Sequence, residues 1–431
     1  MRTQFLRRAV LSALVTASFT IAARADVLVV DANAGPYFDI ATAVAVANAG
    51  DVVLVKSGFY GAFTIDAKSV AVIADAGATV NVGAGVRVQN LASTQHVTIA
   101  GLRNESDFAL APQLTISACA GSVRVTDCAL GAGFGPLGGA VAPVVVVTSS
   151  DDVALHRCTL RANYDFMSGG AEAVRAQTSR VSLLGSSVEG GVGVSGTPGG
   201  MTGGPNTSGL EGKSGIVCRN STLFVAGATV IGGPGGSGVG GSCSSPYDYP
   251  TGGGGGGVGL QVADAAGPAS KVTVLDAALQ GGDGGNGGSG NGGCSDAPDG
   301  KSGSTSEGAA PVELSGAQRT LASIAPTREG ALMRVRFEGL AGDRVYLALS
   351  ARANFEVDRA LHGVVLVQTP LERRYMGTID ASGVLVVQLP VGELGAGVQV
   401  RLRHAQAFFV DTTNTGWVSG VATALLLDGA H

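Results

Sequence analysis

The sequence predicts an all-β protein in which a parallel β-solenoid with glycine-rich loop insertions precedes a C-terminal antiparallel β-sandwich domain. Three observations predict this: a short apolar pattern that returns at regular intervals, 69 glycines among 431 residues, and a different residue pattern after residue 319. Glycine exceeds twice its usual share of about 7%, and charged residues, at 14%, fall below their usual share of about 25%. An apolar fraction of 45% excludes a chain that is disordered throughout.

Residues 1–25 have the pattern of a secretory signal peptide. Arg2, Arg7 and Arg8 precede an apolar stretch over 9–22, and Ala23-Arg24-Ala25 supplies a small-x-small cleavage site. We therefore expect a mature chain that begins at Asp26 and is secreted or displayed at the cell surface. Apart from this leader, no apolar run approaches the ~20 residues of a membrane span.

An apolar-x-apolar pair, followed after four intervening residues by another apolar residue, recurs along the chain. It starts anew after 26 to 30 residues four times, and then after 42 and 49 residues. The pairs and their third positions are Val123/Val125 with Leu130, Val153/Leu155 with Leu160, Val181/Leu183 with Val188, Leu223/Val225 with Val230, and Val272/Val274 with Leu279, with looser copies from Val70 and Val97. Alternation over three to five residues predicts short strands with one buried face.

A further short apolar segment stands upstream of each copy. These segments are Val86–Val88, Leu114–Ile116, Val145–Val147, Val174, Ile216 and Leu260–Val262, and a last one, Val312–Leu314, has no complete partner. Such short strands bury a core only when equivalent strands stack coil upon coil, which predicts a solenoid over 26–318. Val125, Leu155, Leu183, Val225 and Val274 should then form one inward-facing column. A β-sandwich with coincidental spacing is the alternative, and the near absence of two-residue hairpin turns argues against it.

The stretch from Tyr37 to Tyr60, YFDIATAVAVANAGDVVLVKSGFY, carries a resemblance. It resembles the opening of right-handed parallel β-helix proteins of the pectin-lyase-like superfamily, in which a short amphipathic helix leads into a G-D-x-V-x-V-x-x-G-x-Y segment. The resemblance implies a right-handed solenoid and a helix around 41–48 that caps the first coil. It also implies a relation to enzymes that cleave or de-esterify acidic polysaccharides.

The two long intervals mark glycine-rich insertions within 185–308, a region that contains 40 of the 69 glycines. Much of the repeat is Gly-Gly-x, and this three-residue period suits polyproline-II strands, which have three residues per turn. Because the runs follow Val188, Val230 and Leu279, three loops should leave one side of the solenoid and hydrogen-bond to one another. Flexible linker is the alternative interpretation.

Six cysteines, all between residues 119 and 294, agree with export. Cys243 and Cys294 each follow a glycine run, and we predict a disulfide between them that clasps the last two loops. The pairing of Cys119, Cys128, Cys158 and Cys218 stays open. No cysteine or histidine spacing suggests zinc, so we expect neither metal nor cofactor.

From residue 319 onward the glycine runs and cysteines end and longer alternating segments follow. We expect strands over 333–337, 345–349, 364–367, 375–378, 384–389, 398–402, 407–410 and 421–427, with the turn at 380–383 joining two of them as a hairpin. This part looks like the C-terminal β modules of large exported bacterial proteins. Such modules serve surface display or sorting, or pack against the last coil of a repeat domain.

Weak candidates for a catalytic site are Arg157, Arg161, Tyr164, Asp165 and Glu172, in the most polar stretch of the solenoid. A carboxylate near an arginine and a tyrosine suits β-elimination or uronate binding. The alternative is a solvated outer face, on which Asp127 and Arg157, equivalent in successive coils, form an ion pair between coils.

Two function classes follow from these observations. The first is a non-catalytic, exported and monomeric scaffold, adhesin or glycan-binding module that meets extracellular polysaccharide or cell-surface components. The second is a polysaccharide lyase or esterase that acts on acidic glycans. Nucleic acid is excluded as a partner because the net charge is −5 with only 28 basic residues.

Overall fold

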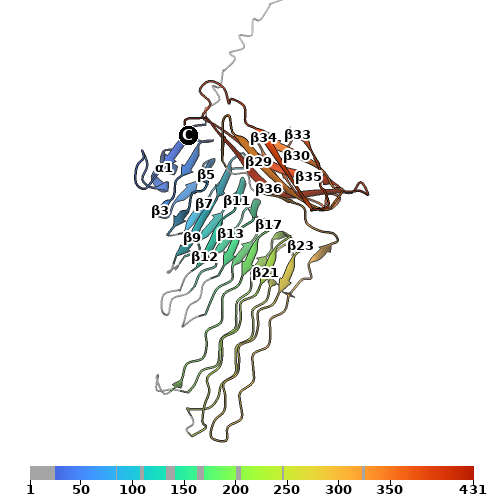
Figure 1. Cartoon of the computed structure of the whole chain (residues 1–431). Coiled ribbons are helices and arrows are strands. Elements are labelled where there is room, and N and C mark those ends of the chain that lie inside the picture. The colour runs from blue at the N-terminus through green and yellow to red at the C-terminus, as the bar shows by residue number, and fades with distance from the viewer. Residues whose placement is uncertain are drawn as a thin grey trace, which may run out of the picture.

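A computed structural model describes residues 25–83, 85–106, 111–132, 141–162, 169–199, 205–244, 247–322 and 326–431. The described part is almost entirely β-structure and contains three long parallel sheets that fit a parallel β-helix-like solenoid (Figure 1). The predicted signal peptide lies outside the described residues, apart from its last residue. Among the described residues, no helix is long and apolar enough to cross a membrane.

Each complete coil of the solenoid contributes one strand to each sheet, as the three apolar positions of the repeat predict, and sheet A has one further strand at each end. Sheet A contains β1 (Val27–Val30), β2 (Val52–Val55), β5 (Val70–Ala74), β8 (His96–Ala100), β11 (Ser122–Thr126), β14 (Asp152–His156), β17 (Arg180–Leu184), β20 (Thr222–Ala226), β23 (Lys271–Leu275) and β26 (Val312–Leu314). Sheet B contains β3 (Gly58–Tyr60), β6 (Val80–Val82), β9 (Leu102–Ser106), β12 (Ala129–Ala132), β15 (Thr159–Arg161), β18 (Ser187–Glu189), β21 (Thr229–Ile231) and β24 (Ala278–Gln280). Sheet C contains β4 (Thr64–Asp66), β7 (Val86–Gln89), β10 (Leu114–Ser117), β13 (Val145–Thr148), β16 (Val174–Gln177), β19 (Ile216–Arg219), β22 (Leu260–Val262) and β25 (Ser306–Glu307).

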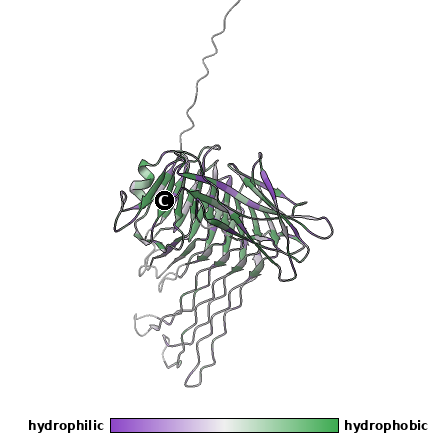
Figure 2. Cartoon of the chain, turned by 45° about the horizontal axis from the view of Figure 1, so that its top comes forward, coloured by the Kyte–Doolittle hydropathy of each residue, from purple (hydrophilic) through white to green (hydrophobic). Residues whose placement is uncertain are grey.

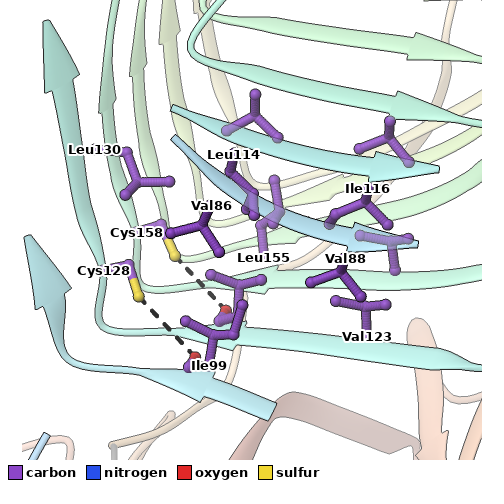
Figure 3. Packing of buried hydrophobic residues seen from close by; sticks show 14 of the residues in the cluster. Val86, Val88, Ile99, Leu114, Ile116, Val123, Cys128, Leu130, Leu155 and Cys158 are labelled. Carbon is purple, nitrogen blue, oxygen red and sulfur yellow. Dashed lines mark hydrogen bonds between the residues drawn. The ribbon is translucent and has the colours of Figure 1, made fainter. Parts of the chain in front are cut away.

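The predicted inward-facing column is confirmed. In sheet A, Val125 pairs with Leu155, Leu155 with Leu183, Leu183 with Val225 and Val225 with Val274, and all five side chains are buried in one cluster. Figure 3 shows how aliphatic side chains from the three sheets fill the interior at the middle coils. One assignment is corrected: β26, expected at the upstream position of a coil, pairs with β23 and so belongs to sheet A.

The four cysteines whose pairing was open are free and buried. The thiols of Cys128 and Cys158 point toward the carbonyl oxygens of Ile99 and Val125 (Figure 3), at 4.0 and 3.6 Å. A hydrogen bond with Cys128 that favours the protonated thiol, together with burial, raises the pKa of Cys158 well above its ordinary value. These cysteines therefore act as small apolar core residues.

Turns between the sheets repeat from coil to coil. Residues with positive φ occupy equivalent corners, such as Ser149, Thr178 and Asn220 between sheets C and A. The next serine in each coil accepts a backbone N–H from the preceding coil: Ser179 Oγ from Ser150 at 3.2 Å, and Ser221 Oγ from Ser179 at 3.0 Å. These bonds satisfy buried polar groups at corners where the sheet ladder is interrupted.

The capping helix forms near its predicted position as α1 (Ile40–Val46). The carboxylate of Asp39 accepts the backbone N–H of Thr42 at 2.7 Å, which satisfies one free donor at the start of the helix. Ile40, Ala43 and Val44 are buried against the first coil. The helix thus covers apolar surface that the first coil would otherwise expose.

The C-terminal part forms three smaller sheets. One contains β27 (Thr320–Leu321), β29 (Leu332–Glu338) and β34 (Val384–Pro390), and a second contains β28 (Thr327–Arg328), β36 (Gly416–Leu427), β35 (Val400–Val410), β30 (Arg344–Ser350) and β33 (Glu372–Thr378). The third pairs β31 (Ala353–Asp358) with β32 (Gly363–Val367). All their pairings are antiparallel except that of β28 with β36.

The hairpin predicted around the turn at 380–383 is wrong. Its strands, β33 and β34, belong to different sheets, because β33 pairs with β30 and β34 with β29. Ile379, between them, is buried and donates its N–H to the carbonyl of Asp343 at 2.8 Å. The chain therefore crosses from one sheet to the other at Ile379, although Asp380 still caps the turn through the N–H of Ser382 at 2.8 Å.

The C-terminal sheets lie along the outer face of sheet A rather than against the last coil (Figure 1). Val52, Leu54 and Ile73 pack on Leu425 and Leu427 at one end, while Phe224 and other residues of β14–β23 pack on a second cluster from the C-terminal sheets, which also includes residues of β36. The strands from β2 to β23 in sheet A are consequently buried largely on both faces. Figure 2 shows hydrophobic strands throughout the solenoid.

Candidate functional site

The catalytic candidates of the sequence occur in ion pairs with separate partners. Arg157 Nε lies 2.9 Å from Asp127 Oδ1, which confirms the predicted pair between coils, and Arg161 Nε lies 3.4 Å from Glu189. Glu172 pairs with Arg175. The other two candidates, Tyr164 and Asp165, lie outside the described residues.

These pairs do not share one position in the coil. Arg157 stands at the corner after β14 in sheet A, and Arg161 ends β15 in sheet B. Glu172 precedes β16 in sheet C. The described candidates therefore give no geometry in which an acid, a base and a cation converge on one substrate atom, as acid–base catalysis requires. The described residues also contain no group of three or more side chains suited to a metal ion.

A second polar cluster lies between sheet A and the C-terminal sheets. Arg124 forms a two-point ion pair with Asp152, at 2.6 and 2.8 Å, and donates to the carbonyl of Asn354 at 2.8 Å. The rings of His96 and His404 meet edge to face, 5.9 Å apart. The Arg124 side chain is only 1% exposed, so the C-terminal sheets close this cluster to a polymeric substrate.

Burial controls the protonation of the histidines in this contact. It lowers the pKa of His156 to about 4 and that of His404 to about 3, and the charge of Arg124 contributes at His404. Neither ring nitrogen of His404 has a hydrogen-bond partner among the described residues. Both imidazoles are therefore neutral near pH 7, and charging them would place cations in an apolar contact.

Three glycine-rich loops project from the corner between sheets B and C (Figure 1). Loop 190–215 joins β18 to β19, loop 232–259 joins β21 to β22, and loop 281–305 joins β24 to β25. We call these three loops the glycine arm. The sequence prediction that the loops emerge from one side is confirmed.

The strands of the glycine arm hydrogen-bond to one another every third residue. Within loop 232–259, Gly254 and Gly257 donate their N–H groups to the carbonyls of Gly236 and Gly233 at 2.8 and 2.7 Å. Between loops, Gly236 donates to Leu210 of loop 190–215 at 2.9 Å, and Gly285 of loop 281–305 donates to Gly254 at 2.8 Å. This spacing equals one turn of polyproline II. The glycine arm is thus an ordered bundle with main-chain bonds between all three loops, as the Gly-Gly-x period predicts.

Close packing of the main chains explains why the repeat needs glycine. A Cβ at Gly254 would stand 2.0 Å from the carbonyl oxygen of Leu210, and one at Gly236 would stand 1.9 Å from that of Val194. At Gly255, which faces outward, the nearest atom would be 3.6 Å away. Two residues in each Gly-Gly-x triplet therefore face neighbouring strands, and the third faces solvent.

The predicted disulfide between Cys243 and Cys294 is present, with the two Cα atoms 5.9 Å apart. It joins the far ends of loops 232–259 and 281–305. Nearby, Tyr247 and Tyr249 are 56% and 55% exposed. Asn206, from loop 190–215, donates from its side chain to the carbonyl of Tyr249 at 3.0 Å and from its main chain to that of Tyr247 at 3.2 Å.

A carboxylate holds the same segment in place. Asp248 accepts the backbone N–H of Ser242 at 3.1 Å and also its hydroxyl, and the hydroxyl bond holds the pKa of Asp248 below its ordinary value. We call Asn206, Ser242 and 247–250 the tip. It presents two aromatic rings on a backbone fixed by contacts from two loops.

Reduction of the disulfide should loosen the glycine arm selectively. The bond closes a separation of 51 residues, so its loss should cost about 2–4 kcal/mol of local stability. Hydrogen exchange of amides in 281–305 should accelerate when a reductant is added, while exchange in sheet A stays unchanged. The remaining four cysteines are free, so the reductant has one target, and a Cys243→Ser/Cys294→Ser variant should show no further response. Equal exchange with and without reductant would contradict the prediction.

Comparisons with known proteins add little. No protein-family model matches the chain, and no curated protein does. Among solved structures the chain is similar to ORF18 of Geobacillus virus E2, with 11% sequence identity, a TM-score of 0.20, and coverage of 85% of this chain and 78% of that chain. A TM-score this low does not indicate a shared fold.

Proposed function

We propose that the protein is an exported, non-catalytic scaffold whose glycine arm presents the tip to extracellular polysaccharide or cell-surface components. The observation that carries the proposal is the pair of exposed rings, Tyr247 and Tyr249, fixed at the end of a hydrogen-bonded and disulfide-clasped arm. Aromatic faces suit sugar rings, and a fixed backbone reduces the entropy lost on binding.

The other parts of the chain support a role in presenting the tip rather than in catalysis. We propose that residues 1–25 direct export, that the solenoid is a right-handed β-helix of the pectin-lyase-like kind, and that the C-terminal sheets form a β-sandwich. Together they would hold the glycine arm away from the bulk of the protein (Figure 1). A lyase or esterase receives less support, because the described members of its candidate set are engaged in separate ion pairs.

Replacement of both tip tyrosines should weaken binding without unfolding the protein. The Tyr247→Ala/Tyr249→Ala variant removes the two rings but none of the main-chain bonds that hold the segment. We expect at least about a tenfold loss of binding to glycan arrays and to whole cells, equivalent to about 1.4 kcal/mol.

Tyr375→Ala is the matched control, because Tyr375 is 54% exposed but lies in the C-terminal sheets. It should bind as the native chain does. The proposal fails if the tip variant retains full binding or if the native chain binds no glycan and no cell surface. Release of unsaturated uronate from pectate or alginate would favour the lyase instead.

A further inference from the structure

The two ends of the solenoid differ. At the first coil, α1 packs its apolar face on the interior. At the other end, β24, β25 and β26 are the last strands of sheets B, C and A. Their outer edges consequently present main-chain N–H and C=O groups that a further strand could pair with.

The last coil is incomplete in sheet B. Sheet A gains β26, but the chain then turns toward the C-terminal sheets, where Gln318 donates its N–H to Asp276 at 2.8 Å. A hollow of about 690 Å³ lies over β24 at this place. Its lining includes Val274, Leu279 and Leu314. The hollow thus occupies the position in which the next strand of sheet B would lie.

In the other two sheets, A and C, the last residue of the inward-facing column at this end is polar. In sheet A, Glu313 pairs with Val274 and occupies a column that is aliphatic in the preceding coils. In sheet C, Ser306 of β25 pairs with Leu260 of the preceding coil and so continues its column with a polar residue. Leu279 of β24, in contrast, ends the sheet B column as a half-buried aliphatic side chain. Of the three inward-facing columns, only that of sheet B therefore ends on an apolar side chain that an added strand would cover.

The charge around the hollow restricts the occupant. Its lining contains the carboxylates of Asp276 and Glu313 and no basic side chain. Two copies of this chain placed end to end at this surface would bring Glu313 against Glu313, which disfavours that pairing. At the capped end of a second copy, α1 already covers the apolar interior of the first coil, so Leu279 would meet no open apolar surface there. The surface suits a basic, extended segment of a different protein.

We propose that the open end of the solenoid receives such a segment, which adds to β24 as a further strand of sheet B. An aliphatic residue of the partner would cover Leu279, and a lysine or arginine two residues along, on the same face of the strand, would pair with Glu313. This is strand addition at a sheet edge, in which main-chain bonds provide affinity and alternate side chains provide specificity. The proposal is independent of what the tip binds.

A labelled peptide provides the test. Lys-Ala-Thr-Val-Ile-Lys copies Ala228–Ile231, the segment that precedes β24 in sheet B, between two lysines, and its Val corresponds to Val230, which pairs with Leu279. Fluorescence anisotropy with the full chain should show saturable binding. Glu313→Lys and Leu279→Glu should each weaken binding about tenfold or more. Glu372→Lys, an exposed charge reversal in the C-terminal sheets, should leave it unchanged.

Two further results would decide the matter. A peptide with proline in place of the central valine should not bind, because it lacks a main-chain donor. Circular dichroism would establish that each variant remains folded. The proposal is overturned if the peptide does not bind, if Glu313→Lys binds it equally well, or if sedimentation shows that the chain dimerises and Leu279→Glu makes it monomeric.

Discussion

Gly254→Ala should disorder the glycine arm, whereas Gly255→Ala, one residue further on, should leave it intact. The Cβ at position 254 would stand 2.0 Å from the carbonyl oxygen of Leu210 and 2.4 Å from its carbon, and both atoms belong to the main chain of a neighbouring strand. Separating the strands would lengthen the bonds from Gly254 to Gly236 and from Gly285 to Gly254. We expect a loss of roughly 3 kcal/mol or more, the upper range for an overpacked site.

Gly255→Ala should have the opposite effect on the stability of the glycine arm. The added methyl group meets no atom closer than 3.6 Å, and Gly255 has a backbone conformation that alanine adopts readily. The loss of unfolded-state entropy should then stabilise the arm by about 0.5 kcal/mol. Hydrogen-exchange mass spectrometry of 232–259 would measure both variants. Equal protection in the two would show that close contact between main chains does not hold the arm together.

Acidification from pH 7 to pH 5 should weaken the contact between the C-terminal sheets and the solenoid by roughly 4 kcal/mol. In the folded protein burial lowers the pKa of His156 to about 4 and that of His404 to about 3, against about 6.5 in an unfolded chain. Between these values the unfolded state binds protons that the folded state does not. Stability is therefore full above pH 6.5 and falls by about 1.4 kcal/mol per pH unit for each histidine as pH decreases toward 4.

Urea unfolding followed by circular dichroism at pH 7 and pH 5 would measure this loss. His404→Leu removes one titrating group whose ring nitrogens have no partner among the described residues, so it should remove about half of the pH dependence. His362→Gln, which alters a ring stacked on Trp417 at 4.0 Å, should retain the native pH dependence. If His404→Leu and the native chain respond equally to pH, burial of this ring is not the cause.

The solenoid could be predicted because its coils repeat a pattern that only stacking explains. Each third apolar position, such as Leu130 or Val188, lies in a strand of sheet B, and each upstream segment except Val312–Leu314 lies in a strand of sheet C. The glycine arm could be predicted from the three-residue period of its sequence and from two cysteines at equivalent places in two loops. Each of these features is local in sequence, and because it recurs along the chain it indicates the fold.

The contact between sheet A and the C-terminal sheets could not be predicted in the same way. Its signal was present: Val52 and Leu54 sit at outward positions yet are aliphatic, so β2 is apolar on both faces, as expected of a strand buried on both sides. Nothing in the sequence shows which distant strands cover such a face. The strands on either side of 380–383 were likewise given the wrong partners, because a turn motif does not reveal that Ile379 is buried between two sheets.

The ion pairs of the candidate site could be predicted only where they join equivalent residues of successive coils. Asp127 and Arg157 could be paired because equivalent residues of successive coils lie one above the other. Arg161 and Glu189 are equivalent in the same way, because each directly follows the third apolar position of its coil, so the repeat also contains the signal for this pair. The pair of Glu172 with Arg175 lies within one coil, and the repeat does not specify it. Asn206, from a separate loop, holds the tip through its hydrogen bond to Tyr249. The sequence around Tyr247 and Tyr249 does not reveal this contact, because it comes from another loop.

The glycine arm has a thermal consequence of its own. Its strands contact one another mainly through peptide groups, so unfolding it would hydrate polar rather than apolar surface. Polar hydration lowers the heat capacity, by about 0.26 cal/K/mol per Å², whereas apolar hydration raises it. The unfolding enthalpy of the arm should therefore vary little with temperature. On cooling, the aliphatic interior of the solenoid loses driving force, but the arm should keep its order close to freezing.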